Sequence, residues 1–383
     1  MLRRGWPPLL AALLLVLLFG LPWYVEAVNR SHPAPWPMVG GDAGLRNYTP
    51  ASFPRAPQVL WSLPVEGIEF MTPLIGANGT IYVNAGTRVI AVGPDGKRRW
   101  AWKSPLRIWS LALSRQGVLY AMDPDTLHAL DENGRLLWRA PLPGAPASHL
   151  IVGQGGAIYY AGGHQLHALA DNGTHRWSVG VGPVLGGPVE SRSGLILMAT
   201  RQGLTAVRPT GEIAWTRSPG EPYQIRPVAA ANGRIYLRTS TRLMVLNEEG
   251  EVVGDEPASP FPSNLAVGRE VVQEGLSRRD GEGRLLWTAA TGAQHRTLFT
   301  MVDRRGNLLV MTNRGLTRGP ADTLVPWLQY ELWDGEGRQL WSLSEIRPMT
   351  EPAVDARGHL CFAGRTGDER PVSLICIGDP AER

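Results

Sequence analysis

Short apolar runs recur along the chain, and a turn containing Asn, Asp or Gly joins them in pairs. The stretch LHALDENGRLLWR (127–139) shows the pattern, and VIAVGPDGKRRWAW (89–102), LHALADNGTHRWSV (166–179) and LTAVRPTGEIAWTR (204–217) repeat it. In each stretch the run after the turn contains a Trp. Alternating runs joined by Gly turns are typical of β-hairpins.

Two markers give the period of this repeat. They are Gly79, Gly117, Gly156, Gly194 and Gly233, each opening a strand, and Trp61, Trp100, Trp138, Trp177 and Trp215. Both series advance by 38 or 39 residues. The second unit reads as strands at about 109–114, 117–122, 126–130 and 135–139. A period of roughly 40 residues with four strands predicts a propeller blade.

The number of units and their ends predict how the ring closes. Weaker copies at 268–287, 306–341 and 358–379 bring the number of units to eight. The last unit lacks its Trp strand, whereas VLWSLP (59–64) precedes any blade that it could finish. We therefore predict an all-β eight-bladed β-propeller of four-stranded antiparallel blades, in which an N-terminal strand completes the last blade and removes the open sheet edges. The repeated Trp is expected to pack between neighbouring blades.

The first 28 residues differ from the rest of the chain. Arg3 and Arg4 precede an apolar run at 9–19, and VEA (25–27) has small residues at the positions that a signal peptidase reads. The segment is either a cleaved signal peptide or a membrane anchor, since apolar residues continue to about Val28. Both alternatives predict export, to the periplasm or the extracellular space. The predicted organisation is 1–28 signal peptide or anchor, 29–57 linker and lead-in, 58–379 propeller and 380–383 tail.

Composition adds little about partners. The net charge of +4 is mild, and no run of like charges resembles a nucleic-acid-binding arm. We expect no nucleic-acid partner, membrane contact only through residues 1–28, and a monomer.

The segment PWPMVGGDAGLRNYTP (35–50), the strand VLWSLP and the later Asp/Asn-Gly-Trp units resemble the quinoprotein-like eight-bladed propellers, the PQQ-like repeat proteins. The resemblance covers about residues 35–379. It implies one of two functions. Some members are periplasmic dehydrogenases that bind PQQ and calcium, and others are non-catalytic and bind protein partners, as the barrel-assembly lipoprotein of the outer membrane does.

Signs of the enzymatic branch are missing from the sequence. Such dehydrogenases typically carry a vicinal Cys pair over the cofactor, whereas Cys361 and Cys376 stand 15 residues apart. The sequence identifies no calcium ligands and no catalytic Asp, because Asp95, Asp131 and Asp171 occupy turn positions. We therefore expect no cofactor and no metal, with PQQ and calcium implied only for a divergent oxidoreductase.

The two cysteines occupy opposed positions of the last hairpin. In the earlier blades the corresponding residues, such as Tyr120 and Ala129, stand nine apart and face each other across the turn. Directly opposed residues have Cα atoms about 4.5–5.5 Å apart, which is within disulfide range. We predict a Cys361–Cys376 disulfide, with two buried thiols as the alternative.

Loop lengths distinguish the two faces of the predicted ring. Links between the first and second and between the third and fourth strands are uniformly tight. The other links vary, and the longest insertion is at 314–327. Binding usually occurs on variable loops of a rigid scaffold. The inner strands begin on this variable face, with one carboxylate, Glu69, and mainly basic and aromatic residues. The ligand-binding candidates are Arg107, Trp109, His149, Tyr223, Arg226, His295, Arg296 and Arg347.

These candidates suit an anionic small ligand or an acidic peptide, because Arg binds carboxylates through paired hydrogen bonds and aromatic rings pack on a partner. A solvated basic rim without a ligand is the alternative. We predict an exported, non-enzymatic propeller scaffold that binds a protein, a peptide or another cell-envelope component on its variable loop face. A divergent PQQ-dependent quinoprotein oxidoreductase is the alternative, and a carbohydrate-binding propeller is a weaker one because the repeat accounts for most Trp.

Overall fold

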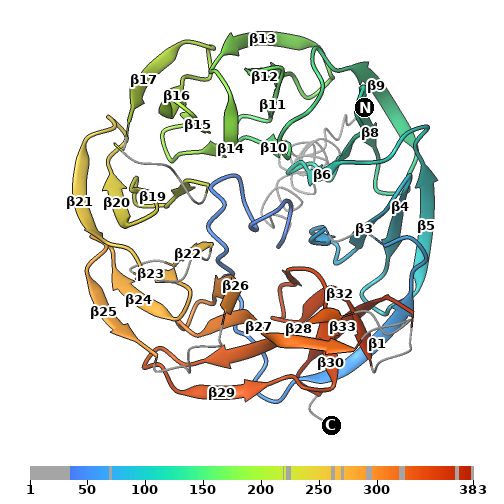
Figure 1. Ribbon diagram of the computed structural model, residues 1–383. Coiled ribbons are helices and arrows are strands. Elements are labelled where there is room, and N and C mark those ends of the chain that lie inside the picture. The colour runs from blue at the N-terminus through green and yellow to red at the C-terminus, as the bar shows by residue number, and fades with distance from the viewer. Residues whose placement is uncertain are drawn as a thin grey trace, which may run out of the picture.

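Eight antiparallel sheets stand around a central axis as the blades of a closed ring (Figure 1). The computed structural model describes residues 35–68, 71–218, 220, 226–259, 264–268, 271–289, 296–318, 324–366 and 371–380. The predicted all-β eight-bladed propeller is confirmed.

Seven blades hold four strands each, ordered from the axis outward. Blade 1 contains β2 (Leu74–Ile75), β3 (Ile81–Ala85), β4 (Arg88–Val92) and β5 (Arg98–Lys103), and blade 2 contains β6 (Ser110–Leu113), β7 (Leu119–Met122), β8 (Thr126–Leu130) and β9 (Leu136–Pro141). Blade 3 contains β10 (Ile151–Val152), β11 (Ile158–Gly162), β12 (Gln165–Leu169) and β13 (His175–Gly180). Blade 4 contains β14 (Val184–Glu190), β15 (Ile196–Thr200), β16 (Gly203–Val207) and β17 (Ile213–Arg217). Blade 5 contains β18 (Val228–Ala229), β19 (Ile235–Arg238), β20 (Arg242–Leu246) and β21 (Val252–Pro257). Blade 6 contains β22 (Leu265–Val267), β23 (Val271–Glu274), β24 (Ser277–Asp280) and β25 (Leu285–Thr288). Blade 7 contains β26 (Arg296–Val302), β27 (Leu308–Arg318), β28 (Leu324–Trp333) and β29 (Gln339–Ser342).

Blade 8 joins the two ends of the propeller. Its strands are β30 (Ile346–Pro348), β31 (Ala353–Val354), β32 (Leu360–Thr366), β33 (Ser373–Gly378) and β1 (Gln58–Pro64). β1 pairs with β33 along the outside of the blade, as predicted, and Figure 1 shows it in blue beside the red C-terminal strands. The inner strand is interrupted, because β30 and β31 both pair with β32 and residues 349–352 lie between them.

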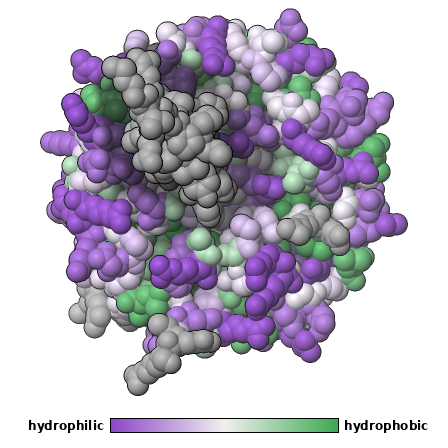
Figure 2. Space-filling view, turned by 180° about the vertical axis from the view of Figure 1, so that it is seen from behind, coloured by the Kyte–Doolittle hydropathy of each residue, from purple (hydrophilic) through white to green (hydrophobic). Residues whose placement is uncertain are grey.

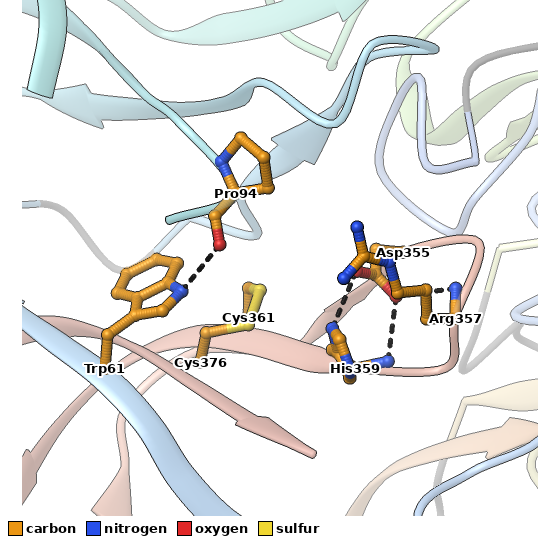
Figure 3. The surroundings of a disulfide bond; sticks show 7 residues. All are labelled: Trp61, Pro94, Asp355, Arg357, His359, Cys361 and Cys376. Carbon is orange, nitrogen blue, oxygen red and sulfur yellow. Dashed lines mark hydrogen bonds and ion pairs between the residues drawn. A yellow bond between two sulfur atoms is a disulfide. The ribbon is translucent and has the colours of Figure 1, made fainter. Parts of the chain in front are cut away.

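The repeated Trp links six of the eight blades to the next one through a hydrogen bond. The Nε1–H of Trp100 on β5 donates to the carbonyl of Glu132 in the outer turn of blade 2, at 2.8 Å. Trp61 on β1 donates to Pro94 of blade 1 at 3.0 Å, so the same contact crosses the closure (Figure 3). Equivalent bonds join Trp177 to Pro209, Trp215 to Glu248, Trp287 to Gly335 and Trp341 to Pro54. The repeat therefore carries its own contact between blades.

This contact predicts a strong effect of a single methyl group. Gly134 has a φ of +78°, and a Cβ added to it would lie 2.6 Å from Trp100. We expect Gly134→Ala to lower the free energy of unfolding by at least about 2 kcal/mol, because both the left-handed backbone and the overpacking are unfavourable. Chemical denaturation measures the loss. Gly155→Ala is the control, since a Cβ at Gly155 meets nothing within 4 Å. Equal losses in the two variants would contradict the contact.

The predicted disulfide is confirmed. Cys361 on β32 and Cys376 on β33 lie directly opposite each other, with their Cα atoms 4.2 Å apart (Figure 3). Both side chains are buried in a cluster that also contains Phe299 of blade 7 and Ile81 of blade 1. The disulfide therefore lies in the blade where the ring closes.

The insertion at 314–327, expected as a long variable loop, mostly extends strands. β27 continues to Arg318 and β28 begins at Leu324, and these two residues pair. The hairpin of blade 7 is therefore longer than those of the other blades.

Most of the exposed large apolar side chains among the described residues lie on the outermost strands of the blades. Leu137 on β9 and Leu286 on β25 are 51% and 56% exposed. The side of the molecule drawn in Figure 2 is mainly hydrophilic, and its apolar residues form small separate groups. Among the described residues no helix is long and apolar enough to cross a membrane. The predicted signal or anchor at 1–28 lies outside those residues.

Candidate functional site

The segment before β1 lies inside the channel, where Figure 1 shows it in blue. We call residues 36–51 the plug. Trp36 exchanges two backbone hydrogen bonds with Ile75, at 3.2 and 2.9 Å. Five carbonyl groups of the plug accept backbone N–H groups from other inner strands. The carbonyls are those of Pro37, Ala43, Gly44, Arg46 and Asn47, and their donors are, in the same order, Leu113, Glu190, Ala229, Val267 and Val302. These partners are the last residues of the inner strands. The plug therefore lies at the end of the channel where the tight turns are.

Side chains of the motif quoted above fix the plug's shape. Asp42 accepts the N–H of Gly44 at 2.9 Å and the Nε–H of Arg46 at 2.6 Å. Asn47 donates its Nδ2–H to the carbonyl of Leu265 on β22 at 2.8 Å. Trp36 is 1% exposed and packs within the core of blades 7, 8 and 1. The plug is thus packed and hydrogen-bonded as an integral part of the fold.

A cavity of about 350 Å³ lies between the plug and the variable face. Its floor is Val39, Gly40, Leu45 and Asn47 of the plug. Its walls are Met71, Thr72, His149, Arg226, Pro227, Val228, Asn264, Leu265, Met311, Met349, Thr350 and Glu351. Most wall residues lie at or just before the start of an inner strand. We call this cavity the channel pocket.

One basic and one acidic side chain, Arg226 and Glu351, line the channel pocket. Thr72 donates its hydroxyl hydrogen to Oε2 of Glu351 at 3.2 Å. Burial raises the pKa of Glu351, and Thr72 and Arg226 oppose that rise. Burial lowers the pKa of Arg226, and the charge of Glu351 opposes that fall. Among the described residues, no hydrogen bond or ion pair joins Arg226 to Glu351. The two groups therefore influence each other across a gap.

The backbone holds each charge in place. A Cβ added to Gly186 of β14 would lie 2.8 Å from Cγ of Arg226, so the missing side chain makes room for the arginine. Glu351 lies in the interruption of the inner strand of blade 8. There Ala363 of β32 accepts the N–H of Met349 at 2.8 Å and donates its own N–H to the Thr350 hydroxyl at 3.0 Å. Glu351 follows directly after these anchored residues.

His149 is the third polar group at the wall that the sequence singled out. Burial, and secondarily the charge of Arg226, lowers the pKa of His149 from 6.5 to about 4. Its Nδ1 is buried and has no hydrogen-bond partner among the described residues. At neutral pH the ring is therefore uncharged.

This pKa shift predicts how acid affects stability. The unfolded chain binds the proton of His149 more tightly than the folded chain, so stability is fully present above about pH 6.5 and falls as the pH drops toward about 4. The full shift corresponds to about 3 kcal/mol. We expect His149→Gln to flatten the dependence of the free energy of unfolding on pH in this range. Chemical denaturation at several pH values measures that dependence. An NMR titration that placed the pKa of His149 near 6.5 would contradict the prediction.

The structure brings together some of the predicted candidates. His149 and Arg226 line the channel pocket. Arg107 and Trp109 are exposed in the link between blades 1 and 2, and Arg347 lies on β30, so none of these three lines the pocket. The candidates outside the described residues are Tyr223, His295, Glu69 and the side chain of Arg296.

Sequence reasoning missed Thr72 and Glu351. Glu351 is the carboxylate among the described wall residues. Pro348 and Pro352 flank it closely, and a Pro pair in an expected inner strand signals an interruption.

The described residues of the channel pocket do not fit PQQ with calcium. Within the described part of the chain, no group of three or more His, Cys, Asp or Glu side chains is placed to hold a metal ion. The amide of Asn264 is hydrogen-bonded to the backbone N–H and carbonyl of Thr300. Both cysteines form the disulfide of blade 8, and neither lines the pocket.

Comparison with known proteins identifies the class as PQQ-repeat propellers. The family model for outer membrane protein assembly factor BamB matches residues 85–183 and 163–367, so the chain belongs to this family. The crystal structure of BamB from Moraxella catarrhalis is similar at a TM-score of 0.62 and 14% identity, covering 86% of this chain and 99% of that one. The WD40 domain of SCAP from fission yeast has a TM-score of 0.51 and 10% identity, covering 84% and 98%. At these identities both structures support the fold alone. The comparison with curated proteins found no match.

Proposed function

We propose that the protein is a non-enzymatic scaffold of the cell envelope that binds a protein or peptide partner on its variable loop face. One observation carries this proposal: the plug occupies the tight-turn end of the channel, and the channel pocket lies toward the variable face. A partner therefore meets varied loops and a shaped, charged pocket on one face.

The family supports a partner in the cell envelope, because its model is named for a factor in outer membrane protein assembly. The disulfide supports an exported location, since disulfides persist in oxidising compartments. The N-terminal segment, as a signal peptide or an anchor, would provide the export.

Aromatic side chains near this face suit a protein partner. Trp109 is 52% exposed and Trp327 is 40% exposed. Trp109 precedes an inner strand and Trp327 lies near the start of β28, so both belong to the variable-loop end of their blades. Exposed Trp is enriched where proteins bind one another.

Photo-crosslinking in intact cells tests the proposed face. A photoreactive amino acid at Trp109 is expected to give a discrete protein adduct. The same residue at Lys97, which is exposed in a tight turn of blade 1, is the matched control and is expected to give none. Adducts from Lys97 alone, or from neither position, would overturn the proposal.

A further inference from the structure

The channel pocket combines one positive and one negative side chain with an apolar wall, and this combination defines a ligand chemistry. We infer that it binds a small zwitterion with an apolar side chain, a free amino acid or a short peptide. The ligand's carboxylate binds Arg226 and its ammonium group binds Glu351. The inference deepens the proposed function and rests on its assignment of binding to the variable face.

The electrostatics of Arg226 and Glu351 provide the first argument for a zwitterion. Arg226 and Glu351 interact electrostatically, yet no hydrogen bond or ion pair between them is found among the described residues. A charge withdrawn from water is costly unless an opposite charge or hydrogen bonds compensate it. A ligand with a single charge would compensate one of the two side chains. A zwitterion placed in the gap compensates both.

The neighbours of these charges support the same assignment. Gly186 leaves room for the stem of Arg226 against β14, and the Thr72 hydroxyl bonds Oε2 of Glu351. Both charged groups are therefore held by the fold. His149 is uncharged at neutral pH, so it leaves the balance of one positive and one negative group unchanged.

The remaining wall is apolar and adaptable. Met71, Met311 and Met349 line the pocket together with Val228 and Leu265. Methionine side chains are flexible and polarisable, so they accommodate apolar groups of different shapes. A volume of about 350 Å³ is near the lower end of the range for small-molecule sites, roughly 300–1,000 Å³. The pocket therefore suits a residue-sized apolar group.

Calorimetric titration of the full-length protein with matched ligands tests the charge requirement. L-leucine and the dipeptide Leu-Leu carry both charges, 4-methylpentanoate lacks the ammonium group, and isopentylamine lacks the carboxylate. We expect at least one zwitterion to bind, and the stronger of the two identifies the source as a free amino acid or a peptide. The singly charged analogues are expected to bind at least about tenfold more weakly, as for the loss of one charged hydrogen bond.

Two variants assign each charge to its residue. Arg226→Gln is expected to weaken binding of the zwitterion about 10- to 100-fold. Glu351→Gln is expected to do the same for the zwitterion but to leave the affinity for 4-methylpentanoate unchanged, which also reports an intact pocket. Arg107→Gln, on the rim and outside the pocket, is the control and should bind as the unmodified protein does.

Several results would overturn the inference. They are no binding of either zwitterion, singly charged analogues that bind as tightly as L-leucine, or a Glu351→Gln variant that still prefers L-leucine to 4-methylpentanoate. These results are separable from a failure of the proposed function. If neither zwitterion binds while Trp109 still forms its protein adduct, the inference fails and the scaffold proposal stands.

Discussion

Loss of the Cys361–Cys376 disulfide is expected to lower the free energy of unfolding by about 3 kcal/mol. The bond closes a loop over a sequence separation of 15 residues, and constraint of the unfolded chain by a loop of that length accounts for about this amount. The loss of stability is expected to act on blade 8, which closes the ring, because Cys376 also pairs with Trp61 of β1. Denaturant unfolding of a Cys361→Ala/Cys376→Ala double variant measures it.

A reductant provides the control for this prediction. Reduction should destabilise the unmodified protein to about the level of the double variant and should leave the double variant unchanged. If reductant and double substitution both left the unfolding midpoint of the protein where it was, the disulfide would contribute nothing to closure.

Trp36→Ala is expected to cost about 3–5 kcal/mol, the range for removing a large buried aromatic side chain. Trp36 is 1% exposed, packs against Gly41 of the plug and hydrogen-bonds through its backbone to Ile75 of β2. The substitution therefore weakens the plug at the point where it begins. Chemical denaturation gives the loss.

Trp109→Ala is the matched control, because Trp109 is 52% exposed. A surface substitution of this kind usually changes stability by less than about 0.5 kcal/mol. If the two Trp variants were equally stable, the plug would add nothing to the fold and the floor of the channel pocket would need another explanation.

The parts of the fold that repeat were predictable from the sequence. The Trp series, the tight turns and the opposed cysteines all follow from a local period, so the number of blades, the closure by β1 and the disulfide could be derived without the structure. Each strand pairs with its neighbour in sequence, except at the β1–β33 closure and where β30 pairs with β32 in the interrupted inner strand of blade 8.

The parts that do not repeat were not predictable. The segment 35–50 was recognised as a motif, but its path through the channel depends on contacts with strands as distant as β26. Arg226 and Glu351 are far apart in the chain and line one pocket only because the ring brings blades 5 and 8 around one axis. Glu351 also lies in an interruption of the repeat, where counting by period misplaces residues.

The measurement that tests the non-enzymatic assignment most directly is calorimetric titration of the full-length protein with PQQ, with and without calcium. The described pocket residues provide no cluster for a metal ion, so we expect no calcium-dependent, saturable binding. Calcium-dependent binding that weakens in Arg226→Gln would contradict the account and would make the channel pocket a quinone site.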